Sequence, residues 1–296
     1  MIKFSKTQIL AALSLALTTV IWGGGFVVTK NAVESVSPAY MMAIRFTVAG
    51  AAIMVIFRKK TAKIKKEDAI PGALLGVWLA VSFITQTYGI KHTTASNNAF
   101  ITTFYVAAVP FINLLIYKIK IRGVHLIAAA IALSGVALLS VDKNFRVNSG
   151  DLLTFACSLC YAVHIVLLGR YAKKRDATAL AAVQMIAAAV FCWVSAFILE
   201  GAFDFGAFTG GSGGTLLGGI LYLALLSTMF GFLSQTFAQK HLPTALVSVL
   251  LTLECVFGAV FSVIFLNDPI NIKITAGFAL MLAAVILSIL KADAGG

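Results

Sequence analysis

The sequence predicts an all-α membrane protein in which ten transmembrane helices form two inverted five-helix repeats around a central cavity. Composition is the first observation: 60% of the 296 residues are hydrophobic and only 11% are charged, which is more apolar than a soluble domain needs to fill its core. The second is that the apolar residues run in segments long enough to cross a bilayer. The third is a seven-residue stretch that occurs once in each half, as expected of a duplicated unit.

The apolar segments have the length of membrane-spanning helices, since a hydrocarbon core of about 30 Å requires about 20 helical residues. The runs are continuous rather than alternating, which favours helices over the strands of an outer-membrane barrel. The first run resembles the start of a signal peptide, but it extends to Thr29 and pairs with an internal segment, so we expect a retained helix. The ten segments lie at about 7–29, 38–57, 69–90, 95–117, 123–141, 151–170, 178–199, 215–237, 242–266 and 271–291.

The repeated stretch reads QTYGIKH at 86–92 and QTFAQKH at 235–241. Upstream of it the spacing between matching residues shortens, and the glycine-rich segment 201–214 absorbs the difference. The chain therefore divides into two homologous repeats, residues 1–145 and 146–296.

The basic residues orient the helices. Seventeen lysines and arginines fall on one side of the predicted membrane and five on the other, which places both termini in the cytoplasm by the positive-inside rule. Five helices per repeat is an odd number, so the second repeat enters from the opposite face. Inverted repeats commonly rock against each other around a site near the midplane, which gives alternating access.

Other functional classes lack the residues that they need. The net charge of +12 comes from loops between apolar runs, so we expect no nucleic-acid partner. No phosphate-binding loop, His-Glu-x-x-His or Gly-x-Ser-x-Gly pattern occurs, so we expect no ATP drive, no catalytic residues and no cofactor. Cys157 and Cys160 have metal-ligand spacing but lack further ligands, so we expect no metal site.

In the first two predicted helices, Trp22 and Arg45 are the informative side chains. Trp22 lies in the outer third of its segment, where it either lines the cavity or belongs to the interfacial aromatic belt. Arg45 is the one cation within a span. For it we favour snorkelling toward the surface, or a tie between helices, over contact with an anionic substrate group.

The third and eighth segments each carry a polar stripe. Trp78 and Gln86 share one face of the third segment, and Gln235 lies on the matching face of the eighth. Such a stripe lines a watery cavity or allows close helix packing, and both interpretations stay open.

In the fourth segment, Asn98, Thr102 and Tyr105 recur at helical spacing, and for them we favour a cavity over interhelical hydrogen bonds. The sixth segment places Tyr161 and His164 on one face. The imidazole there either titrates or stacks against cargo, or serves as a structural donor, which is the favoured role.

The ninth segment contains Ser248, Thr252 and Glu254. Glu254 lies near the middle of the span, where a carboxylate costs about 2.5–3.5 kcal/mol, so it should face a cavity, find a partner or be protonated. Contact with a substrate cation, proton coupling and a structural bond that caps a broken helix stay open for this residue.

A set of short motifs extends along the chain. The motifs are WGGGF at 22–26, SP at 37–38, RF at 45–46, QTYG at 86–89, TTASNNAF at 93–100, YV at 105–106, Pro110, LE at 253–254 and NDP at 267–269. As a set they resemble the EamA-type transporters of the drug/metabolite transporter superfamily. The resemblance implies a ten-helix inner-membrane carrier that moves small metabolites, often outward, through a cavity between its halves.

The sequence departs from the family pattern at three places. Cys255 replaces the proline of the Leu-Glu-Pro signature, Asp268 replaces the usual glutamate, and Lys118 to Lys120 stand where an acidic turn is expected. Without that proline, the sequence gives no basis for a kink in the ninth segment. Members of the family carry chemically different cargoes, so the resemblance leaves the substrate open.

The favoured prediction is a secondary active transporter that exports amino acids or related small metabolites across the inner membrane by alternating access. Its expected partners are a small-molecule substrate and the lipid bilayer, with the proton as a candidate coupling ion through Glu254 or His164. The alternatives are a membrane-embedded enzyme and a non-transporting membrane sensor or partner protein. Oligomeric state, coupling ion and direction of flux stay open.

Overall fold

Helices make up nearly all of the chain. The computed structural model describes residues 5–141, 147–204, 206–209, 213–242 and 244–290. Within these ranges there is no strand, only an isolated antiparallel bridge between Val141 and Val147. The helices are α1 (Lys6–Ala32), α2 (Pro38–Ile56), α3 (Arg58–Thr61), α4 (Lys66–His92), α5 (Ala95–Thr102), α6 (Tyr105–Tyr117), α7 (Gly123–Ser140), α8 (Ser149–Ala172), α9 (Ala177–Glu200), α10 (Gly206–Thr209), α11 (Gly213–Leu221), the π-helix η1 (Tyr222–Phe230), α12 (Gly231–His241), α13 (Thr244–Leu266) and α14 (Ile272–Leu290).

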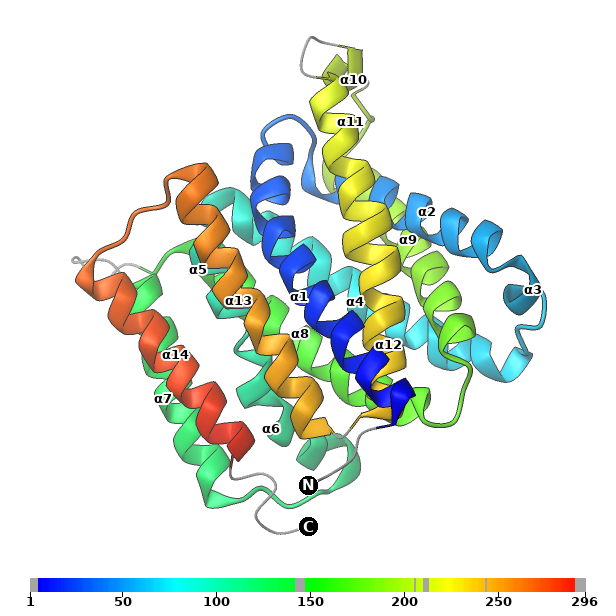
Figure 1. Cartoon of the computed structure of the whole chain (residues 1–296). Helices are drawn as coiled ribbons and strands as arrows, with labels where there is room; N and C mark the ends of the chain where they lie inside the picture. The colour runs from blue at the N-terminus through cyan, green and yellow to red at the C-terminus, as the bar shows by residue number, and fades with distance from the viewer. Residues whose placement is uncertain (1–4, 142–146, 205, 210–212, 243, 291–296) are drawn as a thin grey trace.

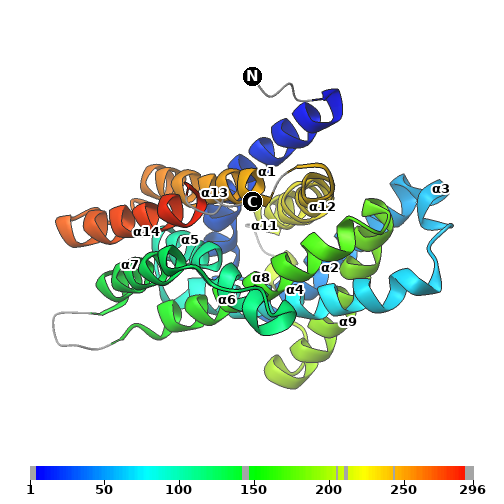
Figure 2. The ribbon, with the colours of Figure 1, turned by 90° about the horizontal axis from the view of Figure 1, so that it is seen from below.

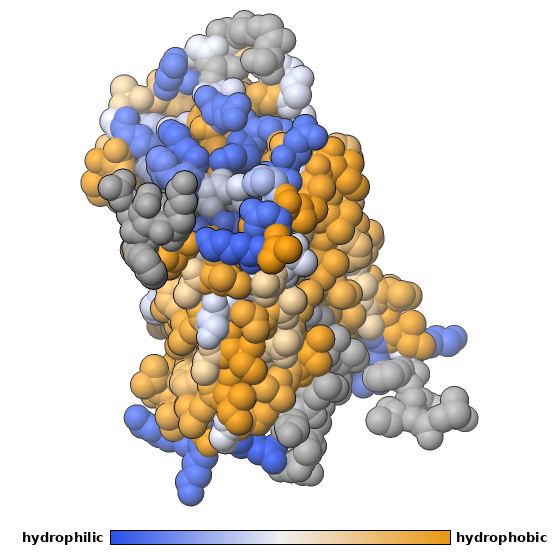
Figure 3. Space-filling model, turned by 90° about the vertical axis from the view of Figure 1, so that its left-hand side faces the viewer, coloured by the Kyte–Doolittle hydropathy of each residue, from blue (hydrophilic) through white to orange (hydrophobic). Residues whose placement is uncertain are grey.

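Most of these helices are long and apolar enough to cross a bilayer. In the described part of the chain, eight stretches meet that criterion, and two shorter apolar helices cover Leu250–Leu266 and Ile272–Leu287. Figure 3 shows a band of apolar residues between two polar ends. This is the surface expected of a protein whose middle contacts lipid and whose ends contact water. The predicted class of an all-α membrane protein is confirmed, and the helices agree with the predicted apolar segments to within a few residues.

The helices pack as pairs along an elongated cross-section. α7 packs against α14 at one end of the molecule, and α2 packs against α9 at the other. Between these pairs lie α1 with α13 and α4 with α8 (Figure 2). α1 begins and α14 ends on the same side of the molecule, at the bottom of Figure 1. The middle of the molecule is therefore enclosed by helices from both halves of the chain.

Helix starts follow the caps that the sequence provides. The side chains of Ser5, Thr94, Asn148 and Asp176 each accept a hydrogen bond from a backbone N–H in the first turn of the following helix. Such a cap satisfies a donor that no helical carbonyl reaches. Short polar residues between apolar runs thus place the starts of α1, α5, α8 and α9.

The fourth apolar segment is not one continuous helix, contrary to the sequence prediction. α5 ends at Thr102 and α6 begins at Tyr105. Thr103 lies in this break, and its hydroxyl donates to the carbonyl of Ala99 at 3.0 Å. A threonine that hydrogen-bonds back onto the preceding turn bends a helix. The break turns the start of α6 into the wall of the central cavity.

A carboxylate at the end of α9 holds the start of α2. Glu200 accepts hydrogen bonds from the Ser37 hydroxyl at 2.6 Å, the Ala39 and Tyr40 amides at 2.9 and 3.1 Å, and the Tyr88 hydroxyl at 2.6 Å. The first amides of a helix have no internal acceptor, and the helix dipole favours an anion there. One side chain therefore links α2, α4 and α9.

We expect Glu200→Ala to lower the midpoint of thermal unfolding of the purified protein. Each hydrogen bond to a charged group contributes about 1.5–3 kcal/mol, and this variant removes several. Glu34→Ala is the control, because Glu34 is exposed. Equal unfolding midpoints for the two variants would contradict the role of Glu200.

Candidate functional site

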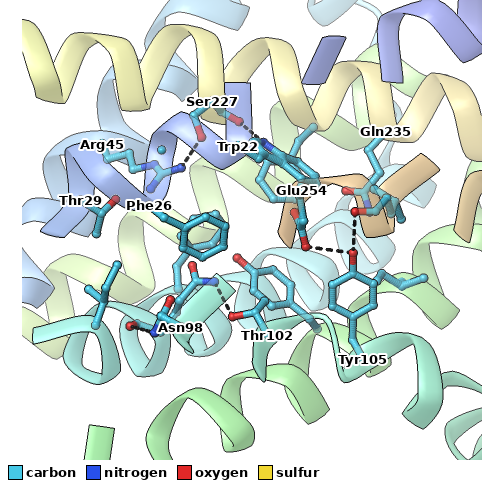
Figure 4. Close-up of a pocket in the computed structure, with 18 residues that line it drawn as sticks. Trp22, Phe26, Thr29, Arg45, Asn98, Thr102, Tyr105, Ser227, Gln235 and Glu254 are labelled. Carbon is cyan, nitrogen blue, oxygen red and sulfur yellow. Dashed lines mark hydrogen bonds between the residues drawn. The ribbon is translucent and has the colours of Figure 1, made fainter. Parts of the chain in front are cut away.

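A cavity lies in the middle of the molecule, among α1, α4, α5, α12 and α13 (Figure 4). The volume open to the centre of a water molecule is about 50 Å³, which holds a few waters, since one needs about 10–15 Å³ on this measure. The cavity is lined by Trp22, Gly25, Phe26, Thr29, Arg45, Phe83, Gln86, Ile90, Asn98, Thr102, Tyr105, Tyr161, Ile165, Ser227, Phe232, Gln235, Leu251 and Glu254.

The structure brings together two thirds of the residues that the sequence predicts as cavity-lining. They come from both halves of the chain and meet across the interface between the halves. The residues that line the cavity as expected are Trp22, Gln86, Asn98, Thr102, Tyr105, Tyr161, Gln235 and Glu254.

The other predicted residues do not line the cavity. Trp78 lies about 12 Å below Gln86 along α4, at 1.5 Å per residue, and packs against a separate apolar cluster of α4, α8 and α9. His164 is buried one layer away, with Nε2 3.1 Å from Gln184 Oε1. Thr252 is buried on α13 outside the lining. The side chain of Ser248 lies outside the described residues.

Glu254 faces the cavity from α13, and its side chain contacts Tyr105. The residue is 5% exposed, and the Tyr105 hydroxyl donates to Glu254 Oε1 at 2.9 Å. No cationic nitrogen in the described part of the chain lies within 4.0 Å of the carboxylate. α13 runs unbroken through this position, so Glu254 does not cap a broken helix. The carboxylate is therefore available to a ligand or a proton.

Arg45 also faces the cavity, from α2. The residue is 3% exposed, and its guanidinium donates to Thr228 Oγ1 at 2.5 Å and Ser227 Oγ at 3.0 Å. The guanidinium carbon lies 4.4 Å from the centre of the Phe83 ring, a cation–π contact. Snorkelling to the surface, one of the two favoured interpretations of Arg45, is wrong. The tie between helices is present, from α2 to η1.

Trp22 is held in the cavity wall by the π-helix η1. In a π-helix the hydrogen-bond ladder is shifted by one residue, a feature frequent at functional sites. The Trp22 indole donates to the carbonyl of Ser227 at 2.7 Å, inside η1. A Cβ at Gly231 would lie only 2.5 Å from Trp22 Nε1, so a glycine is needed there. Hydropathy does not reveal η1, because its residues are as apolar as those of an ordinary membrane-spanning helix.

The wall formed by α4 and α5 carries polar side chains that bond to each other. Gln86 Nε2 donates to Thr102 Oγ1 at 3.0 Å, and Asn98 Nδ2 donates to Thr154 Oγ1 at 2.7 Å. The carbonyl oxygens of the Asn98 and Gln235 side chains are buried and have no hydrogen-bond partner among the described residues. A buried acceptor without a partner is uncommon in native proteins and calls for a ligand or a water.

A second, polar cleft of about 550 Å³ lies beside the cavity and is lined by Lys30, Lys273 and Asp151 among others. Lys30 also separates the two spaces. Its ammonium donates to the carbonyls of Ile90 and Thr93, both at 2.8 Å, and Ile90 lines the cavity. These bonds join α1 to the end of α4 and to Thr93, between α4 and α5, on this side of the cavity.

A largely apolar cavity that also contains a buried arginine and a buried glutamate, surrounded by helices long enough to span a membrane, is an arrangement typical of membrane transporters. Residues 9–141 and 148–290 each match the profile of the EamA-like transporter family. The chain belongs to this family, as the sequence motifs indicate.

Curated relatives carry related descriptions. An "Uncharacterized transporter" of Archaeoglobus fulgidus is 28% identical over 95% of this chain and 87% of its own length. "Uncharacterized transporter YetK" of Bacillus subtilis is 21% identical over 97% and 88%. "Uncharacterized inner membrane transporter YedA" of Escherichia coli is 26% identical over 60% and 59%. A solved crystal structure covers 95% of this chain and 96% of its own with a TM-score of 0.68 and 17% identity, which shows a shared fold.

Proposed function

We propose that this protein is a secondary active transporter that exports amino acids or related small metabolites across the cell inner membrane by alternating access. The observation that carries the proposal is the pair Arg45 and Glu254, two opposite charges that line one buried cavity in membrane-spanning helices. Ionisable groups at such depth are costly and usually mark a substrate or ion pathway.

Two inverted repeats account for the shape of the cavity. Eight long stretches and two shorter apolar helices support the ten crossings that we propose, and the two family matches fall within the proposed repeats 1–145 and 146–296. Tyr105 and Glu254 occupy corresponding positions of the repeats, and they touch. Such a contact at the interface of the halves is expected where a pseudo-two-fold axis lies in the membrane plane.

Hydrogen bonds link helices beyond both ends of the cavity, which supports a carrier over an open pore. Those of Lys30 lie at one end. At the other, Lys240 Nζ donates to the Arg175 carbonyl at 3.1 Å and Gln8 Nε2 to the His241 carbonyl at 3.4 Å. These bonds tie α12 to α1 and to the turn after α8. The substrate therefore needs the halves to separate, first on one side and then on the other.

The basic residues support an orientation with both termini in the cytoplasm. α1 starts and α14 ends on one side of the molecule, in keeping with an even number of crossings. Lys240 and Arg175 then belong to the cytoplasmic closure, and Lys30 to the outer one.

For proton coupling, Glu254 is the stronger candidate. It faces the cavity, whereas His164 lies behind the wall against Gln184. A carboxylate that holds either a proton or a substrate cation exchanges one for the other across the membrane. This is the coupling that we propose for export.

The test is flux in proteoliposomes that contain a pH-sensitive dye. We expect amino-acid efflux accompanied by opposite proton movement. Chemical conversion of the compound would instead favour a membrane-embedded enzyme. Ligand binding with neither flux nor conversion would favour a sensor or partner protein and overturn the transport role.

A further inference from the structure

The two charges of the cavity are placed at different sides of it and are not paired with each other. Figure 4 shows Arg45 beside Ser227, and Glu254 beside Tyr105, with Phe26 between the two sides. No ion pair within 4.0 Å joins them in the described residues. Removing one partner of a buried charge pair is strongly destabilising because it leaves an uncompensated charge. Neither Arg45 nor Glu254 is compensated by the other, so a bound ligand, or for Glu254 a proton, is needed to neutralise each charge.

We propose that the cavity binds a zwitterion whose carboxylate is held by Arg45 and whose ammonium group is held by Glu254. This inference rests on the proposed transport function and names the substrate class of the same cavity. It also fixes how the substrate is oriented between the two halves, because Arg45 belongs to the first repeat and Glu254 to the second.

The guanidinium has donors to spare. A guanidinium carries five N–H groups; hydrogen bonds to Thr228 and Ser227 use two, so three have no hydrogen-bond partner in the described part of the chain. The cation–π contact with Phe83 holds the group in place. Free N–H groups in a fixed planar fork match the two oxygens of a carboxylate.

The other side of the cavity has acceptors to spare. Glu254 receives one hydrogen bond, from Tyr105, and an ionised carboxylate has about four acceptor positions. The Gln235 side-chain oxygen lies on the same side (Figure 4) and has no partner among the described residues. An ammonium group has three donors and no acceptor, so it fits this side and not the other.

The middle of the cavity is apolar. Phe26 lies between the charges (Figure 4), and Trp22, Tyr161, Ile165 and Leu251 contribute further apolar surface to the lining. An apolar side chain of the zwitterion fits against these residues. A space of about 50 Å³ is smaller than such a molecule, so the helices must separate to admit it.

This arrangement selects against molecules with a single charge. A bound cation leaves the Arg45 guanidinium buried and unpaired. A bound anion leaves the Glu254 carboxylate without a cation, so that it stays unpaired or must take up a proton. An unpaired buried charge costs several kcal/mol, whereas a zwitterion compensates both. We therefore expect a neutral zwitterion to bind at least about tenfold more tightly than its singly charged analogues.

The test measures ligand-dependent thermal stabilisation of the purified full chain with the twenty protein amino acids. Each amino acid that stabilises the protein is compared with its amide, which lacks the carboxylate, and with its deaminated acid, which lacks the ammonium. We expect both analogues to bind at least tenfold more weakly than the zwitterion.

Two variants test which residue binds the carboxylate of the zwitterion and which binds its ammonium group. Arg45→Gln should remove the preference for the zwitterion over the amide, and Glu254→Gln the preference over the deaminated acid. Arg170→Gln and Glu34→Gln are matched controls, since both residues are exposed and outside the cavity. Arg45→Lys keeps the charge and should keep the preference, even if Arg45→Gln does not fold.

Equal binding of the three compounds by the wild type, or no stabilisation by any amino acid, overturns the inference. So does a variant that loses affinity for all three compounds alike. Binding of the zwitterion without flux in proteoliposomes overturns the transport function and leaves the assignment of the charges intact. Flux of amino acids without a preference for the zwitterion overturns the assignment of the charges and leaves the transport function intact.

Discussion

Glu254→Gln is expected to abolish the pH dependence of transport and to slow export at least about tenfold, since hydrogen bonds to a charged group contribute about 1.5–3 kcal/mol and 1.4 kcal/mol corresponds to tenfold. The glutamine keeps the size of the side chain but can neither ionise nor take up a proton. A cavity with this variant therefore has nothing to exchange for the ammonium group of the substrate. The measurement is substrate efflux from proteoliposomes at a series of pH values.

Two further variants make this result specific. Glu34→Gln removes a carboxylate outside the cavity and should leave the pH profile as in the wild type. Tyr105→Phe removes the hydrogen bond that the Glu254 carboxylate accepts from the Tyr105 hydroxyl and should shift the profile without abolishing it. A profile that Glu254→Gln leaves unchanged would remove Glu254 from the coupling step.

Gly23→Ala is expected to destabilise the protein strongly, although alanine is a better helix former than glycine. A Cβ at this position would lie 2.5 Å from the Cβ of Phe257 and 2.8 Å from the amide nitrogen of Gly258. α1 and α13 would have to move apart, and overpacking of this kind costs about 1–3 kcal/mol. The unfolding midpoint in detergent measures the effect.

Gly169→Ala is the matched control, because a Cβ there meets no atom within 4 Å. It should leave the unfolding midpoint unchanged or raise it, since alanine favours the helix by about 1 kcal/mol over glycine. The Gly23 variant should also lose ligand-dependent stabilisation, because α1 carries Trp22 and α13 carries Glu254. A Gly23 variant as stable as the control would show that α1 and α13 do not pack as closely as described.

The class of fold follows from the sequence because a bilayer imposes the length and polarity of each helix. The helix bounds were predicted well for that reason. Two local features escaped prediction. Thr103 donates to the carbonyl of Ala99 at the break in the fourth segment, and Trp22 donates to a carbonyl of η1 from another helix. Neither interaction leaves a pattern in hydropathy.

The spacing of the repeated stretch in the sequence, applied downstream, pairs Tyr105 with Glu254, and in the structure their side chains form a hydrogen bond. Helical spacing alone was less reliable. It placed Trp78 on the same stripe as Gln86, but the stripe extends past the cavity along α4. For Arg45, spacing left both snorkelling and a tie between helices open, because the tilt and depth of a helix in the bundle are set by packing, which one sequence does not contain.

The central claim is that one cavity opens alternately to the two sides of the membrane. A counterflow experiment tests this claim most directly. Proteoliposomes with the wild-type protein are loaded with an unlabelled amino acid that stabilises it, and a trace of the labelled amino acid is added outside. We expect label to accumulate inside above its external concentration and then to decline, and we expect Glu254→Gln to lose this overshoot. Label that only rises to equality, or that does not enter at all, would contradict alternating access.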